Sequence, residues 1–411
     1  MLNNKTFYIQ NLNIFLISIL PLGLIIGTLI SNTIIFLICI FFIYDLSIKN
    51  NFFYLNQKNF YFLIIIYIYL ILNSYFISEN QESLIKSFGF VRFIILAYAV
   101  SYYYRESGNR ILKIWTFFFI IVSLDILFEY VFGKNILGFQ SQYPARITSF
   151  SGDEMKIGGY YFGFILLSLF YLKKYKQNFF LLLLIIFFII SLLIGERSNF
   201  IKIFIMYFLF FTFFYNISYL KKFFSIILLF AISVLIIINI PGLKSKFYNH
   251  IVDQELRENI KLKKESIDYN KIISNNRHLS HYYVATEIFK ENILFGSGFK
   301  SFRIESPKKK YQKNGIYGAS THPHQFHFEI LSELGLVGYI LIFSNLIYIL
   351  FKKFNYNKDL IRTGALLFIL ASLIPILPSG SFFTSYGATI FFINYSFLIQ
   401  TKDYDKIKSK N

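Results

Sequence analysis

Residues 320–339 read STHPHQFHFEILSELGLVGY. Two histidines, His322 and His324, lie one residue apart just before an apolar run that continues far enough to enter a membrane. Nine apolar stretches and a long basic segment come before this point, and three apolar stretches follow it. The sequence therefore indicates a polar site at the end of a bundle of membrane helices.

The composition indicates an all-α polytopic membrane protein. Hydrophobic residues make up 55% of the 411 residues, aromatic residues 21%, and the mean hydropathy is +0.53. Uncharged runs of about 18 residues recur, and each is long enough to cross about 30 Å of hydrocarbon. Irregular backbone must then lie outside the bilayer or be shielded from lipid. The single cysteine, Cys39, lies inside an apolar run, which excludes a disulfide framework and a cysteine-based zinc site.

The apolar stretches predict about twelve transmembrane helices with both chain ends in the cytoplasm. The positive-inside rule supports this orientation, since nineteen Lys and Arg residues fall on the segments assigned to the inside and five on the short outside loops. The predicted spans are 12–29, 32–47, 60–77, 87–104, 114–132, 157–172, 178–194, 198–215, 223–240, 328–351, 360–377 and 382–399.

The chain divides into three predicted parts. Residues 1–240 hold spans one to nine, residues 241–325 form a large outside loop that carries part of the site, and residues 326–411 hold the last three spans and a cytoplasmic tail. The loop contains fifteen Lys and Arg and eight Asp and Glu, within a chain of net charge +19. This basic loop is either an ordinary solvated surface or a surface that attracts anionic lipid phosphates or polyanionic sugars. We expect membrane lipids, and not nucleic acid, as its partner.

Local patterns predict the elements of this loop. Residues 255–273 and 279–291 read as helices, and residues 291–302 as a turn that contains Gly296 and Gly298. The polar, Lys-rich stretch 303–319 is expected to be mobile.

Two arginines are candidates for an anion clamp. Arg197 lies in the short connection between the seventh and eighth predicted spans, and Arg277 precedes the second loop helix. Two guanidiniums that face one cavity would hold a diphosphate, because Arg binds phosphate oxygens in a bidentate manner and keeps its charge. The plainer alternatives are an Arg197 paired with neighbouring Glu196 and an Arg277 on the open surface.

The histidines before the tenth span are candidates for proton transfer. His322, His324 and His327 crowd together, but their spacing to Glu329 and Glu333 fits no strong zinc pattern. The alternatives are solvated loop histidines or a general base whose pKa is poised near neutrality.

Two further arginines lie near the same face. We expect Arg92, a few residues inside the fourth span, to pair with Asp125 or Glu129 of the fifth, since a buried charge needs a partner. A direct phosphate contact is the alternative for Arg92. Arg146 lies in an outside loop that either covers the site or is a plain connector. The sequence has no nucleotide-binding motif, and we expect no cofactor and no metal.

Three motifs occupy residues 195–340. The first is G-x-R-S, the second is R…A-x-x-I-F…N-x-x-x-G-x-G, and the third is H-x-H-Q followed by L-x-E-x-G-x-x-G. With the twelve-span pattern and the large loop, they resemble the O-antigen ligase and O-antigen polymerase superfamily of bacterial envelope glycosyltransferases. Gln325 stands where that family usually has Asn. The matching residues are Gly195, Arg197, Ser198, Arg277, Ala285, Ile288, Phe289, Asn292, Gly296, Gly298, His322, His324, Gln325, Leu331, Glu333, Gly335 and Gly338.

The resemblance implies a GT-C-like, metal-independent inverting enzyme of the bacterial inner membrane whose site faces the periplasm. Its donor would be a glycan on undecaprenyl diphosphate, and its acceptor the lipid A–core oligosaccharide. His324 would be the base, and Arg197 and Arg277 would hold the diphosphate. The substrate-binding residues would include Arg146, His322, Arg92, Gly296 and Gly298.

Three alternatives stay open on the sequence. A polymerase would pass the glycan to another carrier-linked repeat unit, and a protein O-oligosaccharyltransferase would pass it to a protein. A transporter of lipid-linked glycan would show internal repeats and polar residues near the membrane midplane. The ionisable residues here gather instead at the outer face, which favours chemistry on that side.

Overall fold

The computed structural model describes residues 2–152, 154–249, 269–313, 315–354 and 359–399, and these contain helices and no strands. The α-helices before the large loop are α1 (Leu2–Ile26), α2 (Thr28–Ile48), α3 (Lys58–Phe76), α4 (Gln81–Gly89), α5 (Val91–Phe132), α6 (Ile157–Tyr175), α7 (Phe180–Leu193), α8 (Arg197–Leu209) and α9 (Tyr219–Asn239). The later ones are α10 (Pro241–Lys244), α13 (Tyr269–Asn275), α14 (Arg277–Glu291), α15 (Phe302–Glu305), α16 (Phe326–Phe354), α17 (Leu360–Ser372) and α18 (Ser385–Ile399). Short 3₁₀ or π turns are η1 (Phe52–Leu55), η2 (Ser149–Ser151), η3 (Gln177–Phe179), η4 (Phe210–Phe214), η5 (Ser245–Asn249) and η6 (Lys309–Tyr311).

The apolar helices make this a polytopic membrane protein. In the described residues, seven helices are long and apolar enough to cross a membrane, and three shorter apolar helices accompany them. Helix α5 has 42 residues and a non-helical Ser107, so it joins the predicted spans 87–104 and 114–132. The kink at Ser107 separates two helices, and the Phe397 ring contacts both Tyr104 before the kink and Trp115 after it, at 4.9 and 6.2 Å between centroids. The count of twelve spans and the GT-C-like fold stay predictions.

The last two predicted spans, 360–377 and 382–399, are shorter as helices than expected. Residues 373–384 between them are irregular because Pro375 and Pro378 cannot continue a helix. Irregular backbone at membrane depth must be covered by protein. Groups from other parts of the chain hydrogen-bond to this stretch. The Tyr282 hydroxyl donates to the Ile376 carbonyl (3.0 Å), and the Lys202 ammonium donates to the Pro378 carbonyl (3.2 Å). The His324 carbonyl accepts from the Ser379 amide (2.7 Å).

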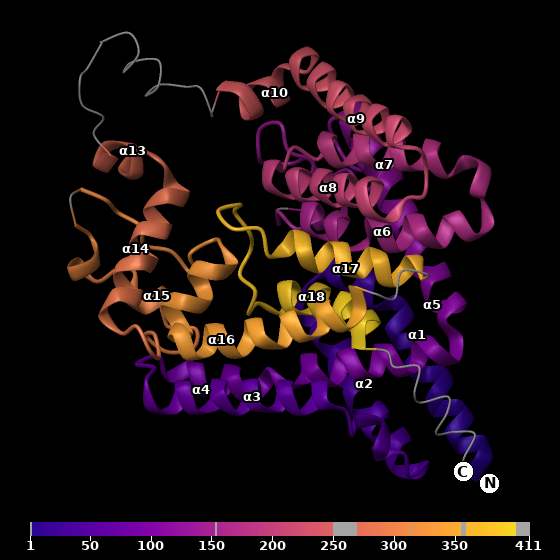
Figure 1. Ribbon diagram of the computed structural model, residues 1–411, viewed down its shortest axis with the longest axis horizontal. Coiled ribbons are helices and arrows are strands. Elements are labelled where there is room, and N and C mark those ends of the chain that lie inside the picture. Colours follow the sequence, from indigo (N-terminus) through magenta and orange to yellow (C-terminus); the bar gives the residue numbers. More distant parts are fainter. Residues whose placement is uncertain (1, 153, 250–268, 314, 355–358, 400–411) are drawn as a thin grey trace.

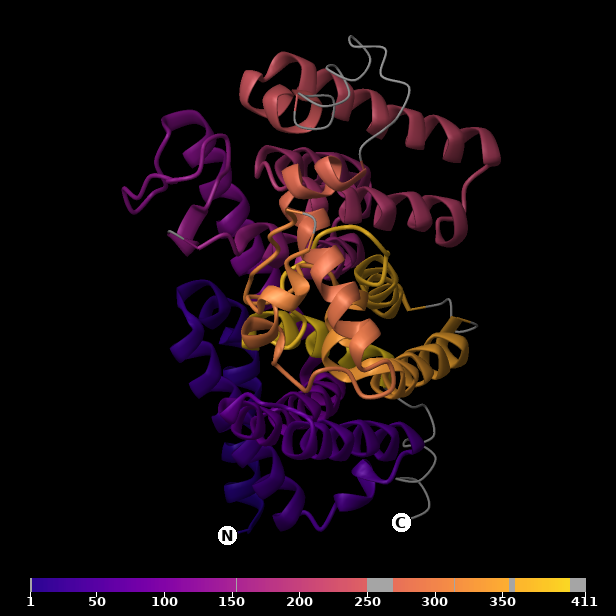
Figure 2. The same ribbon diagram turned by 90° about the vertical axis from the view of Figure 1, so that its left-hand side faces the viewer.

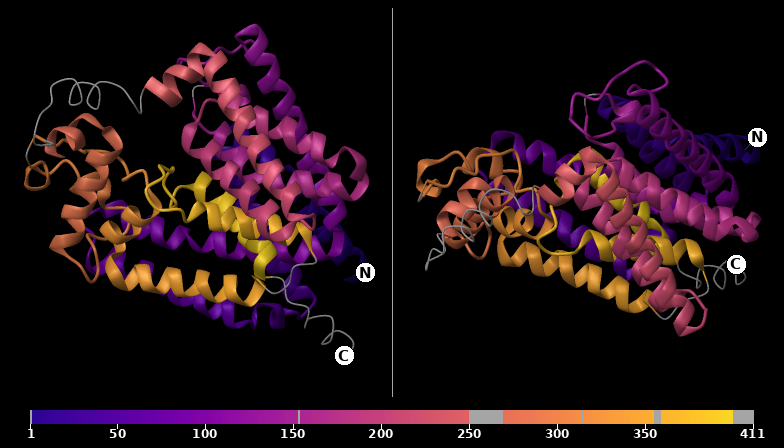
Figure 3. Two further views of the ribbon diagram at one scale, coloured as in Figure 1. Left: turned by 45° about the horizontal axis from the view of Figure 1, so that its top comes forward. Right: turned by 90° about the horizontal axis from the view of Figure 1, so that it is seen from above.

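The loop helices lie at one end of the bundle. Figure 1 shows α13, α14 and α15 beyond the left-hand ends of α3 and α16, whereas α1 begins at the opposite end. Figure 2 looks onto this end, and the orange loop elements lie in front of the bundle between α9 above and α3 below. Both views of Figure 3 agree. The loop elements and the start of α1 are therefore on opposite sides of the bundle, as the predicted topology requires.

Main-chain contacts lock the turn after α14 onto the start of α16. Helix α16 is kinked at Gly335, and the amides of Leu336 and Val337 donate to the carbonyls of Ile293 and Leu294 at 2.9 and 3.1 Å. These residues belong to the second and third sequence motifs. The two motifs therefore form one interlocked structural unit.

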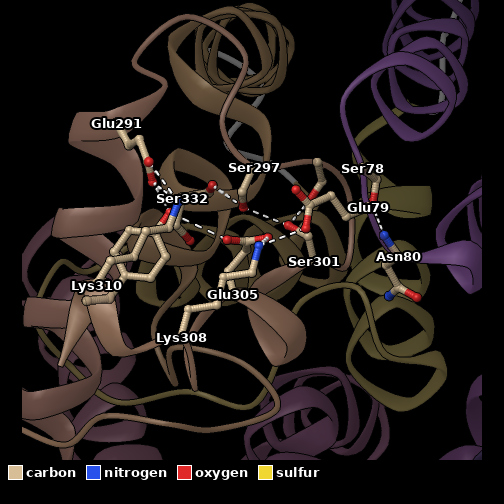
Figure 4. A network of polar contacts seen from close by, with 12 residues as sticks. Ser78, Glu79, Asn80, Glu291, Ser297, Ser301, Glu305, Lys308, Lys310 and Ser332 are labelled. Atoms are coloured by element: carbon tan, nitrogen blue, oxygen red, sulfur yellow. Dashed lines mark hydrogen bonds and ion pairs between the residues drawn. The ribbon is translucent and has the colours of Figure 1, made fainter.

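Side chains add a polar network around the same turn, shown in Figure 4. Lys308 pairs with Glu79 before α4 and with Glu305 of α15, each at 2.7 Å, and Lys310 pairs with Glu291 at 2.7 Å. The exposed pairs Lys308–Glu79 and Lys310–Glu291 each contribute little, whereas Glu305 is buried. The main effect of the Lys308–Glu79 pair is to hold the loop against the connection between α3 and α4.

The sequence predictions for the loop are partly confirmed. The expected helix 279–291 is α14, and the turn at 291–302 is present. Most of the expected helix 255–273 lies outside the described residues. The expectation of a mobile 303–319 is wrong, because α15 and η6 form there, Tyr311 is buried and Lys308 and Lys310 are paired.

A pair of glycine substitutions tests the packing of the turn. Gly298 has a φ of +105°, and an added Cβ would lie 2.4 Å from the Ser78 Cα. Gly315 has a φ of +73° with nothing within 4 Å. Both Gly→Ala changes introduce left-handed backbone strain of roughly 1–2 kcal/mol, and Gly298→Ala adds overpacking of about 1–3 kcal/mol. We expect Gly298→Ala to lower the thermal unfolding midpoint in detergent clearly more than Gly315→Ala; equal midpoints would contradict this packing.

Candidate functional site

Four histidines form a cluster at the outer end of the bundle. His278 and His281 lie three residues apart on one face of α14, whose first turn is capped by the Asn276 side chain. His322 and His324 lie in the segment before α16. The ring of His324 is 4.0 Å from that of His322, 5.2 Å from His281 and 5.6 Å from His278, measured between centroids. The term histidine cluster refers below to these four residues.

Hydrogen bonds leave ring nitrogens of this cluster free for a ligand. The Nδ1 atom of His281 lies 3.0 Å from the Gly318 carbonyl oxygen. A carbonyl only accepts, so Nδ1 carries the proton and Nε2 presents a lone pair. Among the described residues, His281 Nε2, His322 Nε2 and His278 Nδ1 are all buried with no hydrogen-bond partner. Buried polar atoms are normally paired, which makes these three atoms candidates for contacts with a substrate.

The environment keeps the cluster neutral at pH 7. Burial, and after it electrostatic repulsion from the neighbouring histidines and from Arg277, lower the pKa of His324 to about 3. Burial and the positive charge of Lys300 lower the pKa of His322 to about 4. The pKa values of His278 and His281 are also lowered, chiefly by burial. Neutral imidazoles can accept protons, but a general base works best with a pKa near the operating pH, so His324 would need its pKa raised to act as one.

The backbone holds His324 in an uncommon conformation. Its φ is +61°, a left-handed value that residues with a Cβ rarely adopt. The Ser379 amide donates to the His324 carbonyl at 2.7 Å, and the Ser320 hydroxyl lies 3.3 Å from Nε2. Strained residues of this kind concentrate at functional sites. The irregular 373–384 stretch thus fixes His324 directly.

Three cations form a second group, called the cation cluster below: Arg146, Arg197 and Lys246. Arg197, the first residue of α8, donates from Nη1 to the Lys246 carbonyl at 3.0 Å. The Lys246 ammonium donates to the Ala145 carbonyl at 2.7 Å. Arg146 directly follows Ala145 in the chain, and its charge acts on both Arg197 and Lys246.

Close packing around Ala145 brings these three segments together. Gly195, with a φ of +76°, leaves room for the Ala145 carbonyl, which would lie 2.3 Å from an added Cβ. Gly242 of α10 approaches from another side, where an added Cβ would lie 2.6 Å from the Ala145 Cβ. The Ile147 amide donates to the Ile194 carbonyl at 3.1 Å. The glycine of the G-x-R-S motif therefore positions Arg197 against the 133–156 connection.

Positive charges of the cation cluster act on the histidine cluster. After burial and His281, the positive charges of Arg197, Arg277 and Arg146 lower the pKa of His278. These charges come from α8, from the exposed first residue of α14, and from the loop before α6. Arg146 and Arg197, which are distant from His278 in the sequence, are thus close enough to it to interact.

Glu196 does not neutralise its neighbour. Its carboxylate is buried and accepts from the Asn199 amide at 2.6 Å, and burial raises its pKa. In the described part of the chain Arg197 forms no ion pair with Glu196, in contrast to the simplest expectation. Arg197 remains directed at the Lys246 backbone.

The expected pairing of Arg92 is wrong. Its guanidinium donates to the Gly89 carbonyl and to the Ser385 hydroxyl, each at 3.0 Å. Asp125 and Glu129 instead accept hydrogen bonds from the connection between α5 and α6, including the Ile136 amide at 2.8 Å. The pairing fails because the returning loop supplies these carboxylates with closer donors.

Gly296 and Gly298 pack against protein backbone. An added Cβ at Gly296 would lie 2.5 Å from the Glu333 carbonyl carbon, and Gly298 abuts Ser78. Both glycines therefore support the loop, and their direct contact with a substrate stays a prediction.

His327 is separate from the histidine cluster. Its ring nitrogens lie 2.9 Å from the Tyr339 hydroxyl and 2.8 Å from the Leu373 carbonyl, within the bundle. Over the described residues, no group of three or more His, Cys, Asp or Glu is arranged to hold a metal ion.

Sequence reasoning missed His278, His281 and Lys246. The R-H-L-S-H spacing at 277–281 would have placed two histidines on the Arg277 face of the helix. For Lys246 the sequence offers no signal, because its role depends on the approach of Ala145, which is distant in the chain.

A comparison with protein families matches residues 181–343 to the family described as O-Antigen ligase. The match covers α7 to the middle of α16, and so includes Arg197, Arg277 and all four clustered histidines. Arg92 and Arg146 lie outside it. The curated proteins contain no match to the chain. The family match confirms the resemblance read from the sequence motifs.

The lowered pKa values predict an acid-sensitive fold. The unfolded chain takes up protons on its histidines as the pH falls below about 6.5, whereas the folded cluster, with its lower pKa values, does not. Stability contributed by the neutral cluster is therefore present above pH 6.5 and is lost toward lower pH. We expect the thermal midpoint in detergent to fall less between pH 7 and pH 5 for the double variant His322→Gln, His324→Gln than for the wild type. Equal falls would contradict the burial of these imidazoles.

Proposed function

We propose that this chain, whose residues 181–343 form an O-antigen ligase family domain, transfers a glycan from undecaprenyl diphosphate to lipid A–core oligosaccharide at the periplasmic face of the inner membrane. Members of this family are glycosyltransferase-like enzymes of lipopolysaccharide biosynthesis. The observation that carries the proposal is the neutral histidine cluster facing the charges of Arg146, Arg197 and Arg277. A base beside an anion clamp is what displacement of a diphosphate requires.

The proposed reaction is a single inverting displacement. His324 accepts the proton of an acceptor sugar hydroxyl, and the hydroxyl oxygen forms a bond to the anomeric carbon of the donor glycan. The bond from that carbon to the diphosphate oxygen breaks, and undecaprenyl diphosphate leaves. Arg197 and Arg277 stabilise the charge that develops on the leaving group, which is the kind of preorganised electrostatic effect that contributes most in many enzymes.

Donor binding would also prepare the base. Burial, the neighbouring histidines and Arg277 hold the pKa of His324 at about 3, which makes it a weak base. A diphosphate placed among the cations adds negative charge nearby, and negative charge favours the protonated imidazole. Its pKa would therefore rise when the donor binds. Proton transfer would then be coupled to the presence of the leaving group.

The orientation supports a lipid-linked donor. The site lies at the end of the bundle that carries the large loop, which the charge distribution assigns to the outside. Membrane helices give access to an isoprenoid chain from the side, while the loop covers the sugar.

A deletion strain tests the proposal through its lipopolysaccharide banding pattern. We expect loss of O-antigen from lipid A–core, with carrier-linked glycan accumulating, and rescue by the wild-type gene. His324→Ala should fail to rescue, since a general base contributes about 10²–10⁴-fold. Arg197→Ala should also fail, since loss of one charge-stabilising donor costs about 10²–10³-fold.

Matched controls separate chemistry from folding. Lys309→Ala changes an exposed residue of the loop and should rescue fully. Protein amounts in membranes must be equal for all variants. A single repeat unit left on the core would favour a polymerase, whose donor site would be the same. An unchanged pattern in the deletion strain would remove lipopolysaccharide as the acceptor, and full rescue by His324→Ala would remove it as the base.

A further inference from the structure

Lys246 lies at the centre of the cation cluster and has two separate contacts. Its backbone carbonyl accepts from Arg197 Nη1 at 3.0 Å, and its Nζ donates to the Ala145 carbonyl at 2.7 Å. An ammonium has three N–H donors. In the described part of the chain one of the three is bonded, so two are left for a ligand.

Among the residues that the structure describes, the charges around Lys246 do not balance. The groups that act on it are Arg146 from the 133–156 connection, and Arg197 and Glu196 from the α7–α8 turn. Glu196 accepts a hydrogen bond from Asn199, and within the described part of the chain three cations surround this one carboxylate. Burial, followed by repulsion from Arg146 and Arg197, lowers the pKa of Lys246 to about 8, and Glu196 opposes this only in part. Like charges held together in a half-buried place are costly unless an anion joins them.

The number and kind of cations in the cluster favour a diphosphate over a single carboxylate. A carboxylate is satisfied by one bidentate guanidinium, whereas two linked phosphates offer more oxygens and more charge than one Arg can meet. The cluster combines two guanidiniums with one compact ammonium, which binds phosphate as a point charge.

We propose that Lys246 is a third diphosphate-binding cation beside Arg146 and Arg197, and that at alkaline pH a diphosphate binds together with a proton taken up by the Lys246 amine. The assignment of the diphosphate to a glycan donor rests on the proposed function. Binding of a diphosphate to the three cations does not depend on transfer.

Binding of a diphosphate and protonation of the Lys246 amine favour each other, because their charges are opposite. A bound diphosphate favours the charged ammonium and raises the pKa of Lys246 above about 8. Below pH 8 the amine is already protonated, and binding takes up no proton. Above pH 8 the amine must gain one, so affinity falls by up to about tenfold per pH unit.

The test measures binding of a water-soluble isoprenyl diphosphate to the full-length protein in detergent by calorimetry at pH 7.5 and pH 9.0. For the wild type, we expect about tenfold weaker binding at pH 9.0 and proton uptake seen as a dependence of the heat on buffer ionisation. Lys246→Arg should bind at both pH values with little change, because its charge persists. Lys246→Met should bind weakly at both.

Lys244→Met is the matched control, because Lys244 is exposed two residues away on the same turn. It should keep wild-type affinity and the wild-type pH dependence. The inference is overturned if Lys246→Met matches the wild type, if Lys246→Arg keeps the full pH dependence, or if the folded wild type does not bind the isoprenyl diphosphate. If Lys246→Met does not fold, the pH dependence of diphosphate binding by Lys246→Arg still tests the inference.

The two proposals fail in different experiments. Wild-type binding with the expected pH dependence, combined with an unchanged lipopolysaccharide pattern in the deletion strain, would overturn the proposed function and keep the Lys246 site. The deletion strain could instead lose O-antigen while Lys246→Met rescues it fully and binds the diphosphate as the wild type does. That result would keep the proposed function and overturn the Lys246 site.

Discussion

Two buried carboxylates at the start of α16 determine where the outer part of the molecule lies. Glu333 accepts from the amides of Lys300 and Phe302 at 3.0 and 3.3 Å, and Glu329 accepts from the Phe382 amide at 2.8 Å and from the Ser381 hydroxyl. A carboxylate inside an apolar bundle is very costly unless it is hydrogen-bonded. These bonds therefore hold both the turn after α14 and the irregular stretch between α17 and α18 against one helix end.

The histidine cluster follows from that arrangement. Helix α14 packs on α16, and the stretch between α17 and α18 binds the backbone of His324 and the side chain of Tyr282. The cations arrive from the other side, where Gly195 and Gly242 let three segments close around Ala145. Two separately built polar groups thus meet at the end of the bundle, one with lone pairs and the other with positive charge.

The sequence predicted the parts that depend on local pattern. Apolar runs predicted the helices, and the charges of the motif residues Arg197 and Arg277 act on the histidine cluster that contains His324. It could not predict contacts that depend on tertiary approach. Lys246 is placed by the hydrogen bond from its ammonium to the Ala145 carbonyl. Arg92 does not pair with Asp125 because the connection between α5 and α6 donates to that carboxylate. Residues 373–377 and 382–384 were predicted as parts of spans, since their apolar composition concealed an irregular backbone.

The meeting of the two clusters is the central claim, and the pKa of His278 reports on it directly. The chain has six histidines, so ¹³C-histidine labelling gives few NMR signals, and His278→Gln assigns the one needed. If Arg197 lies where its charge acts on His278, Arg197→Gln removes a nearby positive charge and raises the pKa of His278 toward its usual value. A pKa of His278 that is the same in the wild type and in Arg197→Gln, while Arg277→Gln raises it, would contradict the convergence of α8 with α14.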